Sequence, residues 1–166
     1  MHKKKILHII TSLGDGGAEG VLYRLISKST KEFLHEVVVL SVDKKYEKLL
    51  KSKKIKVYNI NLSKNKIQIK KIFKLYSIIK SKKDYTIQTW LYHADFLGGL
   101  LAYISGNRNI YWNIRTSEIS IKSTKFKTLI IIFLNAILSW VVPKKIIICS
   151  KNSIAVHKSI GFKNKF

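Results

Sequence analysis

Short apolar runs alternate along the chain with longer stretches of helical periodicity. The β-branched runs predict six strands, and the stretches with apolar residues every three to four positions predict six helices. The strands are expected at Lys5–Thr11, Glu36–Val42, Ile55–Ile60, Tyr85–Thr89, Ile110–Ile114 and Lys145–Cys149. The helices are expected at Ala18–Ser29, Tyr46–Ser52, Ile67–Lys80, Ala94–Ser105, Phe126–Trp140 and Lys151–Ile160. This order predicts an α/β fold with a Rossmann-like, doubly wound parallel sheet.

Several of the strand runs are nearly continuous in apolar residues, as expected for strands that helices cover on both faces. With 166 residues, one proline and no Gly/Ser-rich or Pro-rich linker, we expect a single domain over residues 1–166. The basic start, Met1–Lys5, precedes too short an apolar run for a signal peptide. The longest apolar stretch, Thr128–Val142, is too short to span a bilayer and predicts a buried or surface-lying helix.

Charge changes this picture, because 32 basic and 9 acidic residues leave a net charge of +23. Two explanations remain open. A lysine-rich composition, in which Arg24, Arg108 and Arg115 are the only arginines, is typical of a genome rich in A and T. Alternatively, the charge attracts an anionic partner. Sparse arginine favours a membrane surface over nucleic acid, so we expect no nucleic-acid partner.

Lysine is densest in the middle third of the chain. From Lys44 to Lys83 there are 15 lysines and one acidic residue, Glu47. The expected helix Ile67–Lys80 has an apolar stripe (Ile69, Ile72, Phe73, Tyr76 and Ile79) with Lys70, Lys71 and Lys74 opposite it. This segment is therefore the expected membrane-facing patch, with an ordinary solvated helix face as the alternative.

The cysteine content indicates a reducing compartment. Cys149 is the only cysteine, so it cannot form an internal disulfide, and its apolar neighbours predict a buried strand position. The histidines show no metal-ligand spacing, and we expect no metal or cofactor. A cytoplasmic location fits these features. A peripheral position on the inner face of the membrane is compatible with it.

Ligands of open parallel sheets bind outside the carboxyl ends of the strands, which directs attention to the loops that follow them. The first loop, Ser12–Glu19, contains three glycines before a helix, so Gly16 and Gly17 could let a phosphate approach the helix N-terminus. An ordinary strand-to-helix turn explains the same glycines. A looser alternative is a dinucleotide-binding turn at Gly14, Gly16 and Gly20, with Asp43 on a ribose, as in an oxidoreductase.

Two later loops carry further candidates. His93 follows the fourth strand, where a neutral imidazole could accept a hydrogen bond from an acceptor hydroxyl, and Asp95 could cap the next helix or orient the ring. A structural turn is the simpler explanation for His93. Arg115 follows the fifth strand, where its planar guanidinium would bind a ligand or pair with Glu118. A third class of function is a non-catalytic basic module that binds anionic membrane.

Four segments resemble the family-four glycosyltransferases, which have the two-domain GT-B fold. Ile6–Glu19 resembles their opening strand and G-G-A-E turn, and Gln88–Gly99 resembles their fourth strand and following helix. Asn113–Arg115 and Ile148–Ser150 match the next landmarks in order. The likeness covers nearly the whole chain, about Lys5 to Gly161, and only the N-terminal, acceptor-side half of a family member.

This resemblance implies retaining transfer of a sugar from a nucleotide-sugar donor to a glycan or lipid-linked acceptor, in cell-surface polysaccharide or glycolipid synthesis. It implies that Gly16 and Gly17 approach the donor diphosphate and that His93 is catalytic at the acceptor site, with Asp95 and Arg115 as further substrate-binding candidates. It also implies peripheral attachment to the membrane. The donor-binding domain of the family has no counterpart in these 166 residues, so we expect the chain alone to be inactive.

Overall fold

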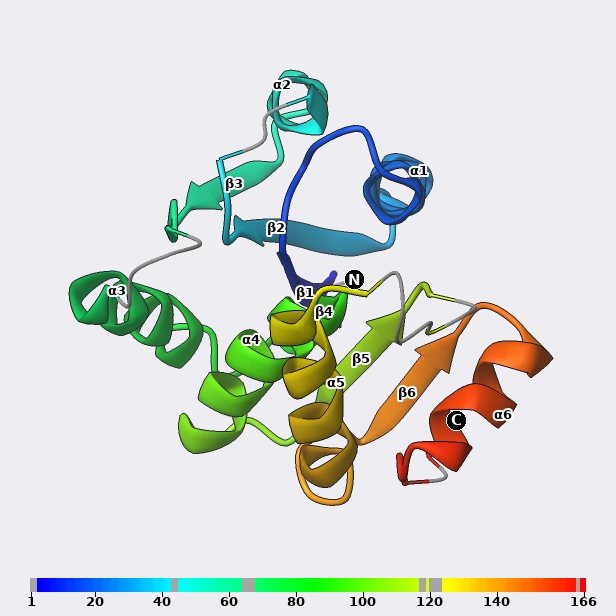
Figure 1. Cartoon of the computed structure of the whole chain (residues 1–166). Coiled ribbons are helices and arrows are strands. Elements are labelled where there is room, and N and C mark those ends of the chain that lie inside the picture. Colours follow the sequence, from blue (N-terminus) through cyan, green and yellow to red (C-terminus); the bar gives the residue numbers. More distant parts are fainter. Residues whose placement is uncertain (1–2, 43–44, 64–67, 117–118, 120–123, 164) are drawn as a thin grey trace.

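The structure is a computed structural model, and it describes residues 3–42, 45–63, 68–116, 119, 124–163 and 165–166. Strands and helices alternate through the described residues (Figure 1). The strands are β1 Lys4–Ile10, β2 Phe33–Val39, β3 Lys56–Asn59, β4 Thr86–Trp90, β5 Ile110–Ile114 and β6 Lys145–Ile148. The helices are α1 Gly17–Ser29, α2 Lys45–Ser52, α3 Ile69–Lys80, α4 Tyr92–Ile104, α5 Phe126–Leu138 and α6 Lys151–Ser159.

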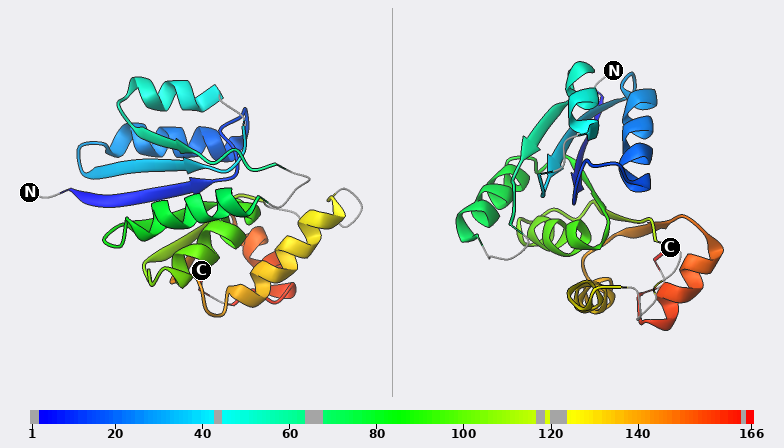
Figure 2. Two further views of the ribbon diagram at one scale, coloured as in Figure 1. Left: turned by 90° about the vertical axis from the view of Figure 1, so that its left-hand side faces the viewer. Right: turned by 45° about the horizontal axis from the view of Figure 1, so that its top comes forward.

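The strands form one parallel sheet in the order β3-β2-β1-β4-β5-β6. Helices α1 and α2 pack together on one face, while α3, α4 and α5 pack in sequence on the other (Figure 2). Helix α6 lies beside the edge strand β6 (Figure 1). The Rossmann-like, doubly wound α/β fold expected from the alternating pattern is therefore confirmed.

The sheet separates two apolar clusters because neighbouring residues of a strand point to opposite faces. On β1, Leu7 and Ile9 join the cluster beneath α3, α4 and α5, whereas Ile10 joins the cluster beneath α1 and α2. On β2, Val38 and Val39 divide in the same way. The continuous apolar runs seen in the sequence thus belong to strands covered on both faces.

Several boundaries differ from expectation. Strand β2 begins three residues before the expected Glu36 and ends at Val39, although Leu40 and Ser41 still donate backbone hydrogen bonds to the Ile10 and Thr11 carbonyls. Helix α4 begins at Tyr92, two residues before the expected Ala94. The early start is made by the backbone of Leu91, which turns sharply out of β4.

The buried face of α3 differs from the expected apolar stripe. Leu75 and Ile79 are its buried residues, whereas Ile69 is 64% exposed and Phe73 is 65% exposed. Helix α3 packs beside α4 and not squarely over the sheet, so it buries a narrow face and leaves part of its apolar stripe in solvent.

The expectation of a buried Cys149 was wrong. Strand β6 ends one residue earlier, at Ile148, and the thiol of Cys149 is exposed. Because β6 pairs only with β5 at the edge of the sheet, its apolar sequence does not guarantee cover on both faces.

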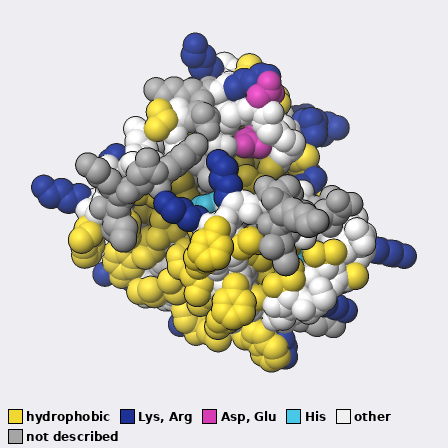
Figure 3. Space-filling view, viewed as in Figure 1, with side chains coloured by type: hydrophobic (Ala, Val, Ile, Leu, Met, Phe, Trp, Pro, Cys, Tyr) yellow, Lys and Arg dark blue, Asp and Glu magenta, His cyan; other side chains and the backbone are white. Residues whose placement is uncertain are grey.

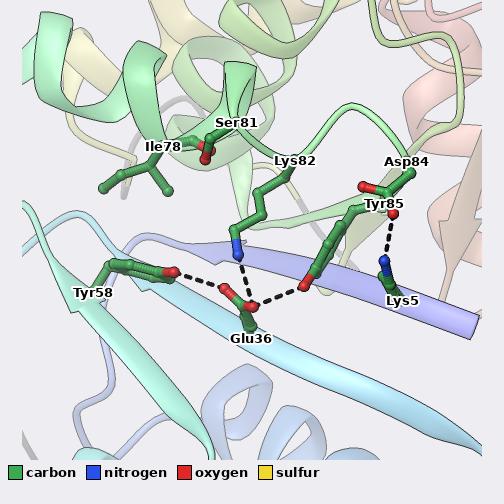
Figure 4. A network of polar contacts seen from close by, with 8 residues as sticks. All are labelled: Lys5, Glu36, Tyr58, Ile78, Ser81, Lys82, Asp84 and Tyr85. Atoms are coloured by element: carbon green, nitrogen blue, oxygen red, sulfur yellow. Dashed lines mark hydrogen bonds and ion pairs between the residues drawn. The ribbon is translucent and has the colours of Figure 1, made fainter. Parts of the chain in front are cut away.

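A buried carboxylate connects β2, β3 and the turn before β4 (Figure 4). Glu36 accepts hydrogen bonds from the Tyr58 and Tyr85 hydroxyls and the Lys82 ammonium group, each at 2.8 Å. These donors lower the pKa of Glu36 despite its burial, and the Glu36 carboxylate raises the pKa of Lys82. The network holds the end of the sheet opposite the site described below.

No helix within the described ranges combines the length and apolar character needed to cross a bilayer.

Candidate functional site

A cleft lies where the chain reverses its direction of winding. Strands β1 and β4 are neighbours, but the chain leaves β1 for α1 on one face and β4 for α4 on the other. The carboxyl ends of such strands frame a crevice. The cleft measures about 460 Å³ and is lined by Gly17, Ala18, Glu19, Val21, Arg24, Leu91 and Arg115. Figure 3 shows a recess on this face in which a histidine lies beside basic side chains.

The first wall of the cleft is the N-terminus of α1. Gly16 is the N-cap residue, and no side chain caps the helix there. The backbone N–H groups of a first helical turn have no intrahelical acceptor, and the helix dipole makes this end positive. A Cβ added at Gly17 would meet no atom within 4 Å, so this helix end is sterically open to a ligand.

Gly16 meets a different constraint. A Cβ there would lie 2.2 Å from a carboxylate oxygen of Glu19, so a larger residue at this position would require the Glu19 side chain to move. Glu19 is nearly buried and accepts a hydrogen bond of 2.7 Å from the Ser12 hydroxyl. The carboxylate therefore braces the turn between β1 and α1, and its negative charge is partly satisfied within the protein.

The second wall is built by a strained residue. Leu91 has φ 71° and ψ 152°, a combination that only glycine adopts without cost. This conformation lets the chain pass from β4 into α4 without a spacer, and Leu91 itself lines the same cleft as Gly17. Backbone strain of this kind concentrates at functional sites.

His93 follows two residues later, in the first turn of α4, and its side chain is exposed. Partial desolvation by the surrounding protein lowers its pKa below the ordinary value of 6.5. The imidazole is therefore neutral at pH 7, with one ring nitrogen able to accept a proton.

Asp95 lies behind the site and not in it. Its side chain is fully buried, and Oδ1 accepts a hydrogen bond of 2.5 Å from the Thr89 hydroxyl on β4. Burial raises its pKa to about 8, so the carboxyl group is largely protonated at neutral pH. No side chain caps α4, so the capping role expected for Asp95 was wrong. Its substrate contact stays a prediction.

Two of the three arginines line the cleft. Arg24 is exposed on α1, on the same helical face as Gly17, and Arg115 is half-buried just beyond β5. The third, Arg108, is engaged elsewhere, because its guanidinium donates to the Tyr103 carbonyl at 2.7 Å and stacks 3.9 Å from the Tyr103 ring. Two guanidinium groups beside an open helix N-terminus make this cleft suited to an anionic group.

The structure thus brings Gly17 and Arg115 to one cleft, with Gly16 and His93 on the adjoining first turns. Five of the seven lining residues were not predicted as site residues: Ala18, Glu19, Val21, Arg24 and Leu91. Arg24 could have been found from its spacing of seven residues after Gly17, which places both on one helix face. The unusual backbone of Leu91 leaves no signal in its side chain.

The alternatives for Arg115 and for the glycine turn have different outcomes. Glu118, the alternative partner of Arg115, and Asp43, the ribose ligand of the dinucleotide alternative, lie outside the described residues. Gly20, part of that same alternative, serves packing, since a Cβ there would lie 3.1 Å from the Tyr46 hydroxyl. Within the described part of the chain, no three His, Cys, Asp or Glu side chains gather as metal ligands.

Comparison with known proteins finds similarity in structure alone. No family model and no curated protein matches the sequence. Anabaena Alr3699/HepE, solved in complex with UDP and glucose, superposes with a TM-score of 0.72 at 17% identity, over 96% of this chain and 42% of that protein. UDP-N-acetylglucosamine 2-epimerase from Rickettsia bellii gives 0.61 at 15% identity, over 98% and 43%. Acinetobacter baumannii MurG gives 0.58 at 16% identity, over 98% and 42%.

These similarities establish the fold as that of the N-terminal half of GT-B proteins, while membership of family four stays a prediction. The chain spans less than half the length of each of these proteins. Because one of them is named as an epimerase, the fold hosts more than one chemistry, and function has to be argued from the site.

Proposed function

We propose that residues 1–166 form the acceptor-side domain of a retaining glycosyltransferase that builds a cell-surface polysaccharide or glycolipid. The observation that carries this proposal is the cleft at the winding reversal, where the open N-terminus of α1 and Arg115 meet beside the first turn of α4. The structural neighbour HepE, solved with UDP and with UDP and glucose, supports a nucleotide-sugar reaction.

The chemistry divides between the two walls of the cleft. The α1 N-terminus at Gly16 and Gly17, with Arg115 and Arg24, would stabilise the negative charge of a donor diphosphate as its bond to the sugar breaks. His93, neutral at pH 7, would accept the proton of the acceptor hydroxyl as that oxygen attacks the anomeric carbon. The acceptor would be a glycan or a lipid-linked sugar, presented at the inner face of the membrane.

Turnover would need a second domain that completes the binding of the nucleotide sugar, as residues 1–166 correspond to only about 42% of the HepE chain. We therefore expect the isolated chain to give no steady turnover with UDP-sugars. Steady release of UDP by the purified chain in the presence of an acceptor would contradict this expectation.

Ligand binding tests the cleft directly. We expect UDP-glucose, followed by NMR of the labelled chain, to shift the Gly17 amide and the Arg115 side chain, and a bound acceptor glycan to shift the His93 ring. Gly17→Ala should abolish the UDP-glucose shifts without loss of stability, because its methyl group enters open space in the cleft. Arg115→Gln should weaken the same shifts. Its matched control is Arg108→Gln, which removes an equal charge from an arginine already engaged with Tyr103.

The opposite result has a clear meaning. If Gly17→Ala and Arg115→Gln bind UDP-glucose as well as the unmodified chain does, the ligand lies elsewhere and the proposed role of this cleft fails. If NAD binds in place of UDP-glucose, the dinucleotide alternative is correct.

A further inference from the structure

A buried polar network joins α6 to the first turn of α4. The Tyr92 hydroxyl lies 2.7 Å from His157 Nε2, and His157 Nδ1 lies 2.6 Å from the Ser153 carbonyl. Burial lowers the pKa of His157, so its ring is neutral at pH 7. A carbonyl oxygen can only accept, so Nδ1 carries the proton of the ring and Nε2 accepts from Tyr92. Tyr92 is 7% exposed and the other two side chains are wholly buried, so this hydrogen bond is shielded from water.

The same helix also reaches the segment that follows β5. The Ser153 hydroxyl donates to the Thr116 carbonyl at 2.7 Å, and Thr116 directly follows Arg115. On the other side of the cleft, Tyr92 directly precedes His93. Successive turns of α6 therefore hold the residues next to both proposed ligand groups.

One of the segments that α6 holds has a backbone that needs support. Leu91 has φ 71°, a conformation that persists only where the surroundings fix it. On the α1 face of the sheet, the Trp90 indole N–H donates to a buried histidine of β1 at 3.3 Å. On the α4 face, Tyr92 donates to His157, and its carbonyl accepts from the Asn135 side-chain amide at 2.9 Å. The strained residue is thus held between two aromatic side chains that are each bonded to a histidine.

Helix α6 is also anchored independently of this network. Just beyond the helix, Phe162 is 4% exposed in the core, and the Lys163 backbone N–H donates to the Ser139 hydroxyl at 2.8 Å. Apolar side chains in place of Tyr92 and His157 could pack there without the cost of burying polar groups. A hydrogen-bonded pair in the interior instead fixes one geometry.

We propose that Tyr92, His157 and Ser153 are positioning residues through which α6 sets the geometry of the cleft. Tyr92 fixes the turn that presents His93, and Ser153 fixes the segment that presents Arg115. This inference rests on the proposed function of the cleft, and it assigns no ligand contact to the three positioning residues themselves. Their role matters because small misplacements of groups around a reacting centre cost much of their effect.

NMR of the full chain without ligand tests the Tyr92 contact. Tyr92→Phe removes only the hydroxyl, and we expect the pKa of the His93 ring to move toward 6.5, because a loosened turn leaves the imidazole better solvated. The matched control is Tyr85→Phe. Tyr85 is also 7% exposed, and its hydroxyl donates to Glu36 at 2.8 Å at the far end of the sheet. This control should leave the His93 titration unchanged.

Replacement of His157 gives a second test, which also covers poor folding of Tyr92→Phe. His157→Leu should shift the His93 titration in the same direction as Tyr92→Phe. His157→Gln should restore it, because the amide oxygen can still accept from the Tyr92 hydroxyl. A purely structural role predicts that the shift follows the melting temperatures of the variants. A positioning role predicts that the shift follows the hydrogen bond.

Ser153→Ala tests the Arg115 segment with UDP-glucose as the probe. We expect the affinity to fall about fivefold, the loss that corresponds to one neutral hydrogen bond. The matched control is Ser139→Ala, because Ser139 is also wholly buried but bonds the segment after α6 and not the cleft. The control should bind UDP-glucose as the unmodified chain does.

Several results would overturn the positioning role. These are an unchanged His93 titration in Tyr92→Phe, an equal shift in Tyr85→Phe, shifts that follow the melting temperatures, and equal affinities of the two serine variants. The His93 titration needs no ligand, so the two proposals fail separately. If the unmodified chain does not bind UDP-glucose but Tyr92→Phe shifts the titration, the proposed function fails and the positioning of the turn stands. If UDP-glucose binds and the titration does not move, the reverse holds.

Discussion

Two buried titratable groups have opposite effects on how stability depends on pH. His8 lies on β1 with its side chain wholly inside the protein, and burial together with the neighbouring His35 lowers its pKa from 6.5 to about 3. Asp95 is equally buried on α4, and its pKa rises from 3.8 to about 8. Folding therefore releases a proton from His8 and takes one up at Asp95 in mildly acidic solution.

The hydrogen bonds of His8 explain why it stays neutral. The Trp90 indole N–H donates to His8 Nδ1 at 3.3 Å, so the proton of the neutral ring is on Nε2, which donates to His35 Nδ1 at 3.0 Å. His35 Nε2 then donates to the Ser29 hydroxyl, which donates to the Leu25 carbonyl. An added proton on His8 would break the bond from Trp90, since a protonated ring cannot accept.

The sizes of the two effects follow from the pKa shifts. For His8, stability is fully present above pH 6.5 and is lost as the pH falls toward 3, by about 5 kcal/mol in total. For Asp95, stability grows as the pH falls from 8 toward 3.8, by about 6 kcal/mol in total. Between pH 6.5 and 3.8 the contributions nearly cancel, each changing by about 1.4 kcal/mol per pH unit in opposite directions.

Single substitutions should reveal each contribution. His8→Gln keeps an amide donor toward His35 but cannot titrate. As the pH is lowered from 6.5 to 4.5, we therefore expect its free energy of unfolding to rise by about 3 kcal/mol relative to that of the unmodified chain. Asp95→Asn should lose a similar amount over the same range. The double variant should run parallel to the unmodified chain, which controls for general damage to the core.

The measurement is the free energy of unfolding in urea at a series of pH values, followed by far-UV circular dichroism. The reasoning is refuted if the His8→Gln curve stays parallel to that of the unmodified chain from pH 6.5 to 4.5. That result would mean that His8 takes up its proton in the folded protein as it does in the unfolded one.

Three further substitutions test single features of the fold. Leu91→Gly should raise stability by about 1 kcal/mol over Leu91→Ala in thermal unfolding, because glycine relieves the positive φ; equal melting temperatures would show that no strain is stored there. Glu36→Gln should lower the free energy of unfolding in urea by about 3 kcal/mol, since it leaves the Lys82 ammonium without its carboxylate; a loss below 1 kcal/mol would contradict the network's role. Gly99→Ala should cost about 2 kcal/mol and alter the near-UV dichroism of Trp112, because its Cβ would lie 2.6 Å from the indole nitrogen; unchanged spectra would refute this close packing.

The sequence predicts the fold well because the fold depends on periodicity. All six strands and all six helices occur where apolar patterns place them, and errors of two or three residues arise at ends that patterns do not specify. The face of α3 was harder, since its stripe from Ile69 to Ile79 would suit burial against a sheet, and only tertiary packing decides that Phe73 stays outside.

The site was predicted in part, for similar reasons. Gly17 and Arg115 follow strands whose carboxyl ends must meet, so topology alone brings them to one edge. The burial of Asp95 could not be predicted, because only two residues along α4 separate an exposed His93 from a carboxyl group wholly inside the protein. The role of Leu91 depends on its backbone angles, which cannot be predicted from the residue type.

The sheet also acts as a partition between two independent interiors. The cluster under α1 and α2 and the cluster under α3, α4 and α5 have no residue in common among the described residues, because the sheet lies between them. Substitutions in α3, α4 or α5 can therefore accumulate without distorting the α1 wall of the cleft. The helical layer on one face can thus diverge in evolution while the turn between β1 and α1 keeps its geometry.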